Sequence, residues 1–408
     1  MQKLPLENIR VIDLTQVRMG PQLTQWLAVM GAEVIKIETN LRQEVSKMQM
    51  AKATGEQEAV DSKRVGYFAS LNYGKKSITL NMKHPKAVGI VKELVKVSDI
   101  VAENFGKAVM EHWGLGYADL KKIKPDIVYY AGSGWGRTGP YSERPAYSPI
   151  IDAFTGIAYA NSFPGGVPLG LGVRGWNDSI SAQHGVFAVL AALYHRSKTG
   201  KGQYIDLSMI EVAMSFAPEQ ALNYAINGKL KGPIGNQDEY MAPHGCYRCK
   251  GEDKWVAIAV SNEIEWVAFC EAIGNPDWTN NQEFNNELSR HKNQDKLDKL
   301  INDWTINFDH IEIMQKLQKA GVMAGASLNV EEVVNDPHLA ERNFFVDIEY
   351  PDKTKLRRTG LPWKLSDTSR GNYRYAPSLG EQNNYVFSEL LGISNDDIQK
   401  LKEEKVIY

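Results

Sequence analysis

The first forty residues constrain the fold most, because they contain the pattern of one complete strand–helix–strand unit. A buried strand rich in β-branched residues is predicted over 9–17, and a Gly-Pro turn follows it. The spacing of apolar residues then predicts a helix over 22–30 and a second strand over 32–38. Strands joined by a helix in this way lie parallel, so we expect an α/β fold around a parallel sheet.

The same alternation continues along the chain. Apolar spacing predicts a helix over 84–97, and strands are predicted over 99–105, 127–130 and 203–207, the last followed by a long helix through Asn223. The first strand is not followed by the G-x-G-x-x-G pattern of a dinucleotide site, so NAD or FAD is not indicated. These elements predict a parallel α/β sheet without a bound dinucleotide.

Composition excludes several classes of partner. Hydrophobic residues make up 43% of the chain, charged residues 24%, and the formal net charge is −2, which is ordinary for a globular protein and does not indicate a nucleic-acid partner. No apolar run reaches the ~18 residues of a membrane span, and the N-terminus lacks the apolar segment of a signal peptide. We therefore expect a cytoplasmic protein that has no membrane partner.

Cysteine usage fits a reducing compartment. The chain has three cysteines, too few for a disulfide scaffold. Cys246 and Cys249 have the spacing of half a zinc site, but no second pair with matching spacing follows them. We therefore expect no metal site and interpret these two cysteines as part of a strand.

Asp178 stands between a glycine-rich coil over 165–175 and an apolar run over 186–193 at helical spacing. One interpretation is structural: Asn177 or Asp178 caps the helix, because a short polar side chain can accept a bond from an unpaired helix N–H. The other is catalytic. Glycines allow a ligand to come close, and a carboxylate can attack an activated acyl group to form a covalent intermediate.

The segment around Asp178 resembles the active site of the class III CoA-transferases, the family of formyl-CoA and carnitine CoA-transferases and α-methylacyl-CoA racemases. Asp178 is followed by Ser-Ile-Ser-Ala and by a helix that ends in Ala-Ala-Leu, with Ala182 where the family usually has glycine. The phrase A-P-S-L-G-E over 376–381 is a further family feature, so the resemblance covers essentially the whole chain. It implies CoA thioesters as substrates and no permanently bound cofactor.

The resemblance also implies a set of CoA contacts that follow the predicted strands. They are Val17, Arg18, Lys75, Asn104, Phe105, Lys107, His112, Gly134 and Arg137. Lys107 or His112 takes the place of the arginine that is usual in the family. Gly134 and Arg137 belong to a loop with four glycines over 132–140, whose exposed amides are able to hold an anion. Arg18 and Arg137 also fit the alternative role of solvated surface cations.

Tyr147 decides between transfer and racemisation in this interpretation. The racemases carry a histidine at the aligned position, and racemisation needs a base on each face of the substrate. A tyrosine with a pKa near ~10 is a poor base at neutral pH, and at ~100° per residue His184 points to a different helix face from Asp178. CoA transfer is therefore favoured; a racemase and a non-catalytic partner subunit are the alternatives.

In the implied transfer reaction Asp178 attacks the donor thioester and later carries CoA as an aspartyl thioester. It must be ionised to attack, and a helix N-terminus is expected to favour the charged form. We expect Arg174 to anchor a second carboxylate of the substrate, and Trp176, Trp135 or Tyr147 to pack against an apolar body. That pattern would suit succinyl-CoA as donor and an aryl-substituted acid such as benzylsuccinate as acceptor.

The resemblance further implies the architecture. A large Rossmann-like domain built from both chain ends would cover 1–225, including a linker helix, and 331–408, and a small α+β domain would cover 226–330. Two chains would interlock, as a homodimer or as a heteromer with a homologous subunit.

Overall fold

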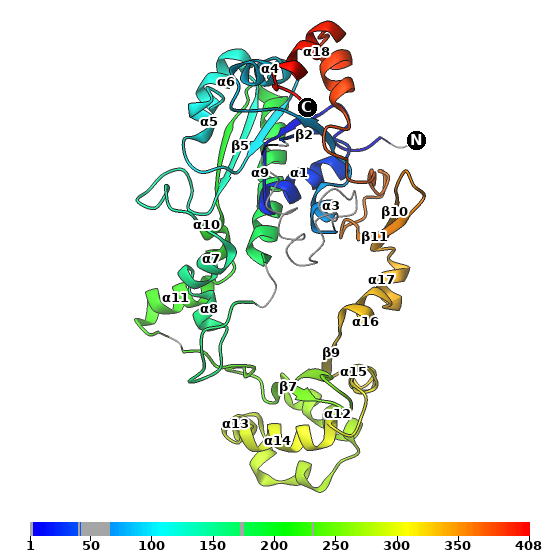
Figure 1. The fold of residues 1–408 in the computed structure, drawn as a ribbon. Coiled ribbons are helices and arrows are strands. Elements are labelled where there is room, and N and C mark those ends of the chain that lie inside the picture. Colours follow the sequence, from blue (N-terminus) through cyan, green and yellow to red (C-terminus); the bar gives the residue numbers. More distant parts are fainter. Residues whose placement is uncertain (1–2, 40, 42–65, 172–174, 231) are drawn as a thin grey trace. The chain divides into compact units, whose positions relative to one another are not determined.

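The computed structural model describes residues 3–39, 41, 66–171, 175–230 and 232–408 (Figure 1). The chain divides into two compact units. The first comprises Met1–Ile157, Gly170–Lys229 and Phe344–Tyr408, and the second comprises Ala158–Leu169 and Leu230–Asn343. Both chain ends belong to the first unit. The second unit extends past the predicted boundary at residue 330 and includes a segment before Asp178 that the sequence pattern had not set apart.

A six-stranded parallel sheet forms the centre of the first unit, as predicted. Its strand order is β3-β2-β1-β4-β5-β6. The strands are β1 (Arg10–Asp13), β2 (Glu33–Glu38), β3 (Lys76–Thr79), β4 (Ile100–Glu103), β5 (Val128–Ser133) and β6 (Tyr204–Ser208). Because the order reverses between β1 and β4, the loops that follow these two strands diverge there. This is where parallel sheets usually bind ligands.

Helices cover both faces of this sheet, because successive strand residues point to opposite sides (Figure 1). Val11 packs into a core with α1 (Met19–Val29) and α9 (Trp176–Thr199). Its neighbour Ile12 packs into a second core with α4 (Pro85–Lys96) and α6 (Tyr117–Ile123). The inner strands β1, β4 and β5 are thus buried on both sides, which explains their largely apolar sequences.

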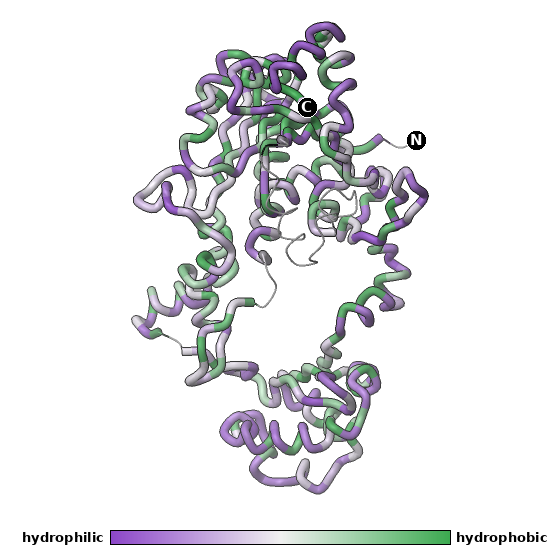
Figure 2. The backbone as a smooth tube through the Cα atoms, in the orientation of Figure 1, coloured by the Kyte–Doolittle hydropathy of each residue, from purple (hydrophilic) through white to green (hydrophobic). Residues whose placement is uncertain are grey.

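The first unit contains further elements besides these strands and helices. They are α3 (Gly66–Asn72), α5 (Val109–His112), α7 (Ser148–Phe154), α10 (Met209–Met214), α11 (Pro218–Asn227), the hairpin β10 (Phe345–Glu349) and β11 (Lys355–Thr359), a π-helix (Tyr385–Leu390) and α18 (Asn395–Glu403). A short helix α8 (Ile157–Ala160) follows α7. The polar helix α18 has no buried residue and is mostly purple in Figure 2.

The prediction of one long helix through Asn223 is wrong, because this stretch forms two helices, α10 and α11. The chain leaves the helical conformation between α10 and α11, where Ala217 has φ −131° and ψ 48°. A proline follows at position 218, and the residue before a proline is disfavoured in helical geometry.

The second unit is an α+β unit with a three-stranded antiparallel sheet. Its elements are β7 (His244–Arg248), β8 (Trp255–Ala259), α12 (Glu263–Ile273), the 3₁₀ helices Asp277–Asn280 and Gln282–Phe284, α13 (Glu287–Lys292), α14 (Gln294–Thr305), α15 (His310–Lys319), β9 (Met323–Ser327), α16 (Val330–Val334) and α17 (Pro337–Glu341). Strands β7 and β8 form a hairpin, and Cys246 lies on β7. Strand β9 was not predicted, because its sequence, Met-Ala-Gly-Ala-Ser, has no β-branched or aromatic residue.

Candidate active site

Asp178 lies in the first turn of α9, at the edge of the sheet where β1 and β4 end. The helix begins after Gly175, whose φ is +72° and which provides no side-chain cap. The expectation that Asn177 or Asp178 is the cap residue is therefore wrong, since both are inside the helix. A Cβ at position 175 would stand 3.0 Å from Asp178 Oδ2, so both the backbone angle and the close approach require glycine there.

Two positive groups from the start of α1 meet the Asp178 carboxylate. The backbone N–H of Met19, the first residue of α1, donates a hydrogen bond to it, and the Arg18 guanidinium adds an attractive charge. Arg18 Nη2 also donates to Ser179 Oγ at 3.1 Å, and this hydroxyl donates to Gln22 Oε1 at 3.0 Å. The start of α1 is thereby joined to the start of α9.

Burial nevertheless has the largest effect on the pKa of the Asp178 carboxylate. It raises the pKa of Asp178 from 3.8 to about 6, against the opposing effects of Arg18 and the Met19 N–H, and the Asp152 charge raises it further. The backbone N–H groups of Met19 and Asp178 favour the charged form, as expected of helix N-termini, but burial outweighs them. The group is still mostly ionised at neutral pH, and its higher pKa makes it a more basic carboxylate than an exposed aspartate.

Arg18 lies beside Asp178 as part of the loop that leads from β1 into α1. Val17, the residue before it, has φ +68°, which is rare for a β-branched residue. The predicted position of these two residues near a ligand edge agrees with the strand order. The side-chain contacts of Arg18 are to the Asp178 region, a role that the sequence pattern did not indicate.

Lys75 requires a correction. Its side chain is fully buried, and its ammonium donates to Asp13 Oδ2 at 2.9 Å, Pro21 O at 2.9 Å and Asn72 Oδ1 at 2.8 Å. An ammonium group has three donors, so these partners satisfy it inside the protein. Lys75 supports the loop after β1 and does not reach a CoA phosphate in this structure.

The residues after β4 meet the loop after β1. Asn104 accepts from the Gln16 N–H at 2.7 Å and donates to Gln16 O at 2.8 Å, so its amide closes the gap at the strand-order reversal. The Phe105 ring packs edge-on against Trp113. Lys107 and His112 are exposed on the segment that follows, with Lys107 Nζ 3.0 Å from Ser142 Oγ.

The glycine-rich loop after β5 is fixed by its neighbours. Gly134 O accepts from the Ile210 N–H at 3.1 Å, and the Arg137 N–H is 3.0 Å from Asp206 Oδ1. Arg137 Nη2 pairs with Glu103 Oε1 at 2.6 Å, and the Glu103 side chain is only 4% exposed. Burial raises the pKa of Glu103 to about 7, although Arg137 opposes the rise. The Arg137 guanidinium is thus already paired in part with the Glu103 carboxylate inside the protein.

The predicted substrate residues differ in placement. Trp176 is partly buried and its indole N–H donates to Asp152 Oδ1 at 2.8 Å. Tyr147 directly precedes α7 and is 63% exposed. The Trp135 ring packs against Phe154 in the same unit, with centroids 4.7 Å apart. Arg174 lies outside the described residues.

The model of CoA-transferase family III matches residues 6–383 of this chain. The chain belongs to CoA-transferase family III. This confirms the resemblance, and with it the assignment of the chain as a transferase.

Curated relatives span almost the full length of the chain. It is 30% identical over 403 residues to the succinyl-CoA–D-citramalate CoA-transferase of Chloroflexus aurantiacus, covering 99% of this chain and 98% of that protein. It is also 30% identical over 407 residues to the succinyl-CoA–L-malate CoA-transferase beta subunit of the same organism, with coverage of 99% and 98%. A solved CAIB/BAIF family protein from Brucella suis has a TM-score of 0.83 at 28% identity, covering 95% of this chain and 100% of that one.

Several residues that shape this candidate site were missed from the sequence. Asp13 ends β1 and is fully buried against Lys75; Glu103 and Asp152 are also buried carboxylates. Buried acids at strand ends carry no local pattern, because their partners come from distant segments. The phrase around Tyr147 contains Asp152, but only the fold shows that it meets α9.

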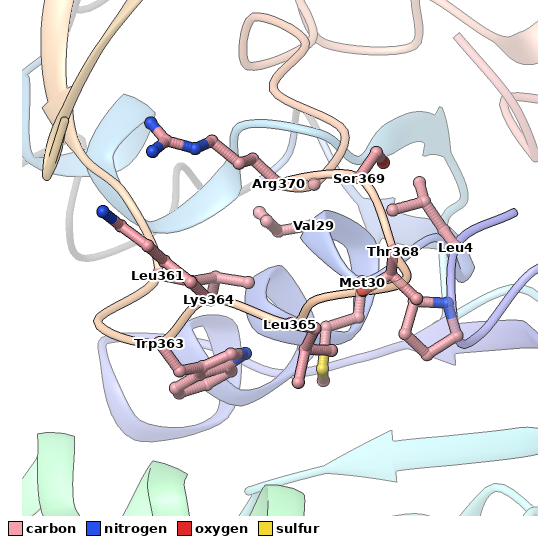
Figure 3. A pocket seen from close by; sticks show the side chains of 12 residues that line it. Leu4, Val29, Met30, Leu361, Trp363, Lys364, Leu365, Thr368, Ser369 and Arg370 are labelled. Atoms are coloured by element: carbon pink, nitrogen blue, oxygen red, sulfur yellow. The ribbon is translucent and has the colours of Figure 1, made fainter. Parts of the chain in front are cut away.

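A separate pocket of about 370 Å³ lies at the other end of α1 (Figure 3). Val29 and Met30 from the end of that helix, together with Leu4, Trp363 and Leu365, line its apolar part. Asp178 meets the N-terminal end of α1, so this pocket is separate from the candidate site around Asp178.

The described residues contain neither a metal-ligand cluster nor a membrane-spanning helix. Within these ranges no group of three or more His, Cys, Asp or Glu side chains is arranged to hold a metal ion. The same part of the chain contains no helix with the length and apolar character needed to cross a membrane.

Proposed function

We propose that this CoA-transferase moves CoA from an acyl-CoA donor to a carboxylic acid through covalent intermediates on Asp178. The observation that carries the proposal is the half-buried Asp178 carboxylate in contact with the Met19 N–H and beside the Arg18 charge. A basic carboxylate held rigidly at the ligand edge of a parallel sheet has the properties of a nucleophile.

The proposed steps balance without an added cofactor. The Asp178 carboxylate attacks the donor carbonyl, the C–S bond breaks, and a mixed anhydride and CoA thiolate form. The thiolate attacks the aspartyl carbonyl, which releases the donor acid and leaves an aspartyl-CoA thioester. The acceptor carboxylate attacks this thioester to give a second anhydride, and the thiolate returns to the acceptor acyl carbon. Each step exchanges one anion for another, so no net proton is consumed.

The CoA chain is proposed to lie along the edge formed by the loops after β1, β4 and β5. Val17, Asn104, Phe105 and Gly134 would contact it, and the exposed Lys107 and His112 would supply charges for its phosphates. Arg18 and Arg137 also remain in this proposed set. Each guanidinium already has one protein partner, Ser179 for Arg18 and Glu103 for Arg137. Binding energy from the nucleotide end can offset the cost of orienting the thioester.

Succinyl-CoA is the proposed donor, since two relatives with full-length matches are named for it. The proposed acceptor is a carboxylic acid with an apolar body, and benzylsuccinate fits this class. Aromatic side chains support that choice: Trp135 and Phe154 pack together in the same unit as Asp178, and Trp176 is two residues from it. Tyr147 and Arg174 keep their predicted substrate roles in this proposal.

We also propose that the active form contains a second chain, either an identical copy or a homologous subunit. Phe187, Leu190 and Tyr194 recur at helical spacing on α9 and are 75%, 36% and 68% exposed. Large apolar side chains in a row on one helix face favour burial against a partner. One relative is named as a beta subunit, which supports the heteromeric form as an alternative to the homodimer.

The experiment is to incubate the protein with succinyl-CoA, quench with hydroxylamine and analyse tryptic peptides by mass spectrometry. Cleavage after Arg174 and Arg196 gives peptide 175–196, in which Asp178 is the only acidic residue. A hydroxamate on this peptide is the expected result, and Asp178→Asn is the matched control that should show none. A wild-type peptide that stays unmodified with a panel of acyl-CoA donors, both alone and with an added homologous subunit, would contradict the proposal.

A further inference from the structure

Asp152 on α7 holds the two residues that directly precede Asp178. Its side chain is nearly buried, with 7% of the residue exposed. Its Oδ1 accepts from the Trp176 indole N–H at 2.8 Å and from Asn177 Nδ2 at 2.9 Å. Hydrogen bonds to a carboxylate are roughly twice as strong as those between neutral groups. One carboxylate thus secures the start of α9 from a neighbouring helix.

A second pair of contacts joins the same two helices. Asn177 Nδ2 also donates to Ser148 O at 3.1 Å, and Ser148 Oγ donates to Asn177 Oδ1 at 2.6 Å. The α9 start has no side-chain cap of its own, since Gly175 precedes it. Helix ends fray when their groups are not held. The position of the first turn of α9 therefore depends on α7.

The position of that turn determines whether Asp178 meets Arg18 and the Met19 N–H. Asp178 is one residue beyond Asn177 and two beyond Trp176. A displacement of the first turn by 1 Å is enough to lower the rate of an enzyme strongly. Contacts at Trp176 and Asn177 are thus contacts that orient the nucleophile.

We infer that Asp152 is a positioning residue for Asp178, which fixes the first turn of α9 and places a second negative charge beside the nucleophile. The inference rests on the proposed function, because it assumes that Asp178 is the group that attacks. It assigns the indole of Trp176 to the support of the nucleophile through Asp152.

The charge has a separate effect from the hydrogen bonds. Two described charged groups act on Asp178 from the elements around it: Arg18, from the loop before α1, lowers its pKa, and Asp152, from α7, raises it. Removing the Asp152 charge should lower the pKa of Asp178 and make its carboxylate a weaker nucleophile.

The test measures the single-turnover rate of the Asp178 adduct from succinyl-CoA as a function of pH. Asp152→Asn keeps the size and the Oδ1 acceptor but removes the charge. We expect its rate at neutral pH to fall by about fivefold and the midpoint of its pH profile to move below that of the wild type. Asp152→Leu removes the acceptor as well, and its rate should fall by about a hundredfold. Asp126→Asn, at the opposite edge of the sheet, is the control.

The outcomes separate this inference from the proposed function. Wild-type rate and midpoint in Asp152→Asn would overturn the inference, and the same result decides it if the leucine variant does not fold. A merely structural role would reduce the amount of folded protein and leave the midpoint unchanged. An absent adduct in the wild type at every pH would instead refute the role of Asp178, and the inference with it.

Discussion

At the scale of single residues, the proposed nucleophile Asp178 carries a cost in stability. The carboxylate is placed against the first N–H of α1 and within the first turn of α9, two positions that favour an anion. Burial outweighs both and raises its pKa to about 6. The folded protein therefore holds this group in a less favourable environment than water, a trade common at active sites.

Asp178→Asn should stabilise the protein in a pH-dependent way. Because the folded-state pKa of Asp178 is raised above its ordinary value of 3.8, ionisation of this group destabilises the folded state, and the penalty grows as the pH rises from about 4 to about 6. Removing the charge should raise the free energy of unfolding by about 2 to 3 kcal/mol at pH 7.5. Denaturant unfolding at pH 7.5 and at pH 4 measures this; an equal effect at both values would contradict it.

At the scale of elements, the loop from β1 to α1 is fixed by a buried charged cluster. Asp13 Oδ1 accepts from the Thr15 N–H at 2.9 Å, and Oδ2 accepts from Thr24 Oγ1 at 2.8 Å and Lys75 Nζ at 2.9 Å. Burial alone would favour the neutral acid, but the Lys75 and Lys36 charges hold the pKa of Asp13 at about 2. The cluster joins the end of β1 to the first turns of α1, the helix whose N-terminus meets Asp178.

Lys75→Met should destabilise the protein strongly, because it leaves the Asp13 carboxylate buried with less compensation. Removing one partner of a buried ion pair costs about 3–5 kcal/mol. The exposed Lys86–Glu404 pair provides a matched control, and Lys86→Met should cost about 1 kcal/mol or less. Urea unfolding of the three proteins tests this expectation. Similar losses of unfolding free energy in Lys75→Met and Lys86→Met would show that the buried Asp13–Lys75 pair contributes no more stability than the exposed pair.

At the scale of the whole molecule, one chain leaves an apolar face of α9 exposed. The same helix carries Asp178 in its first turn and Phe187, Leu190 and Tyr194 farther along on its exposed side. An association of chains through this face would bury these three side chains and also brace the helix that holds the proposed nucleophile. The proposed assembly and the proposed active site thus share one element.

Phe187→Glu should weaken that association without unfolding the chain, since the side chain is 75% exposed in the single chain. A buried charge without a partner costs several kcal/mol at an interface, enough to shift a dimer toward monomers. Native mass spectrometry at fixed concentration measures the shift. Ile264→Glu is a control of equal chemistry, because Ile264 is 83% exposed on α12. An unchanged mass for Phe187→Glu would exclude this face as the interface.

Local patterns predicted much of the fold and one central residue. The β-branched strands and the apolar helix spacing predicted the parallel sheet, because strands buried on both faces need apolar side chains on both faces. The motif around Asp178 identified the family, which the family match confirms. Lys75 shows the limit: a lysine beside a turn has the pattern of a surface cation, and only the packing of Asp13, Pro21 and Asn72 around it reveals an internal role.

The sequence by itself determined the parallel α/β core and the membership in CoA-transferase family III, because both depend on spacing within short segments. The tertiary structure alone decided which distant groups surround Asp178. Met19 and Arg18 reach it from α1 and the loop before it, and the Asp152 charge acts from α7. Their effect on the carboxylate depends on distance and burial, and these arise only when segments far apart in the chain pack together.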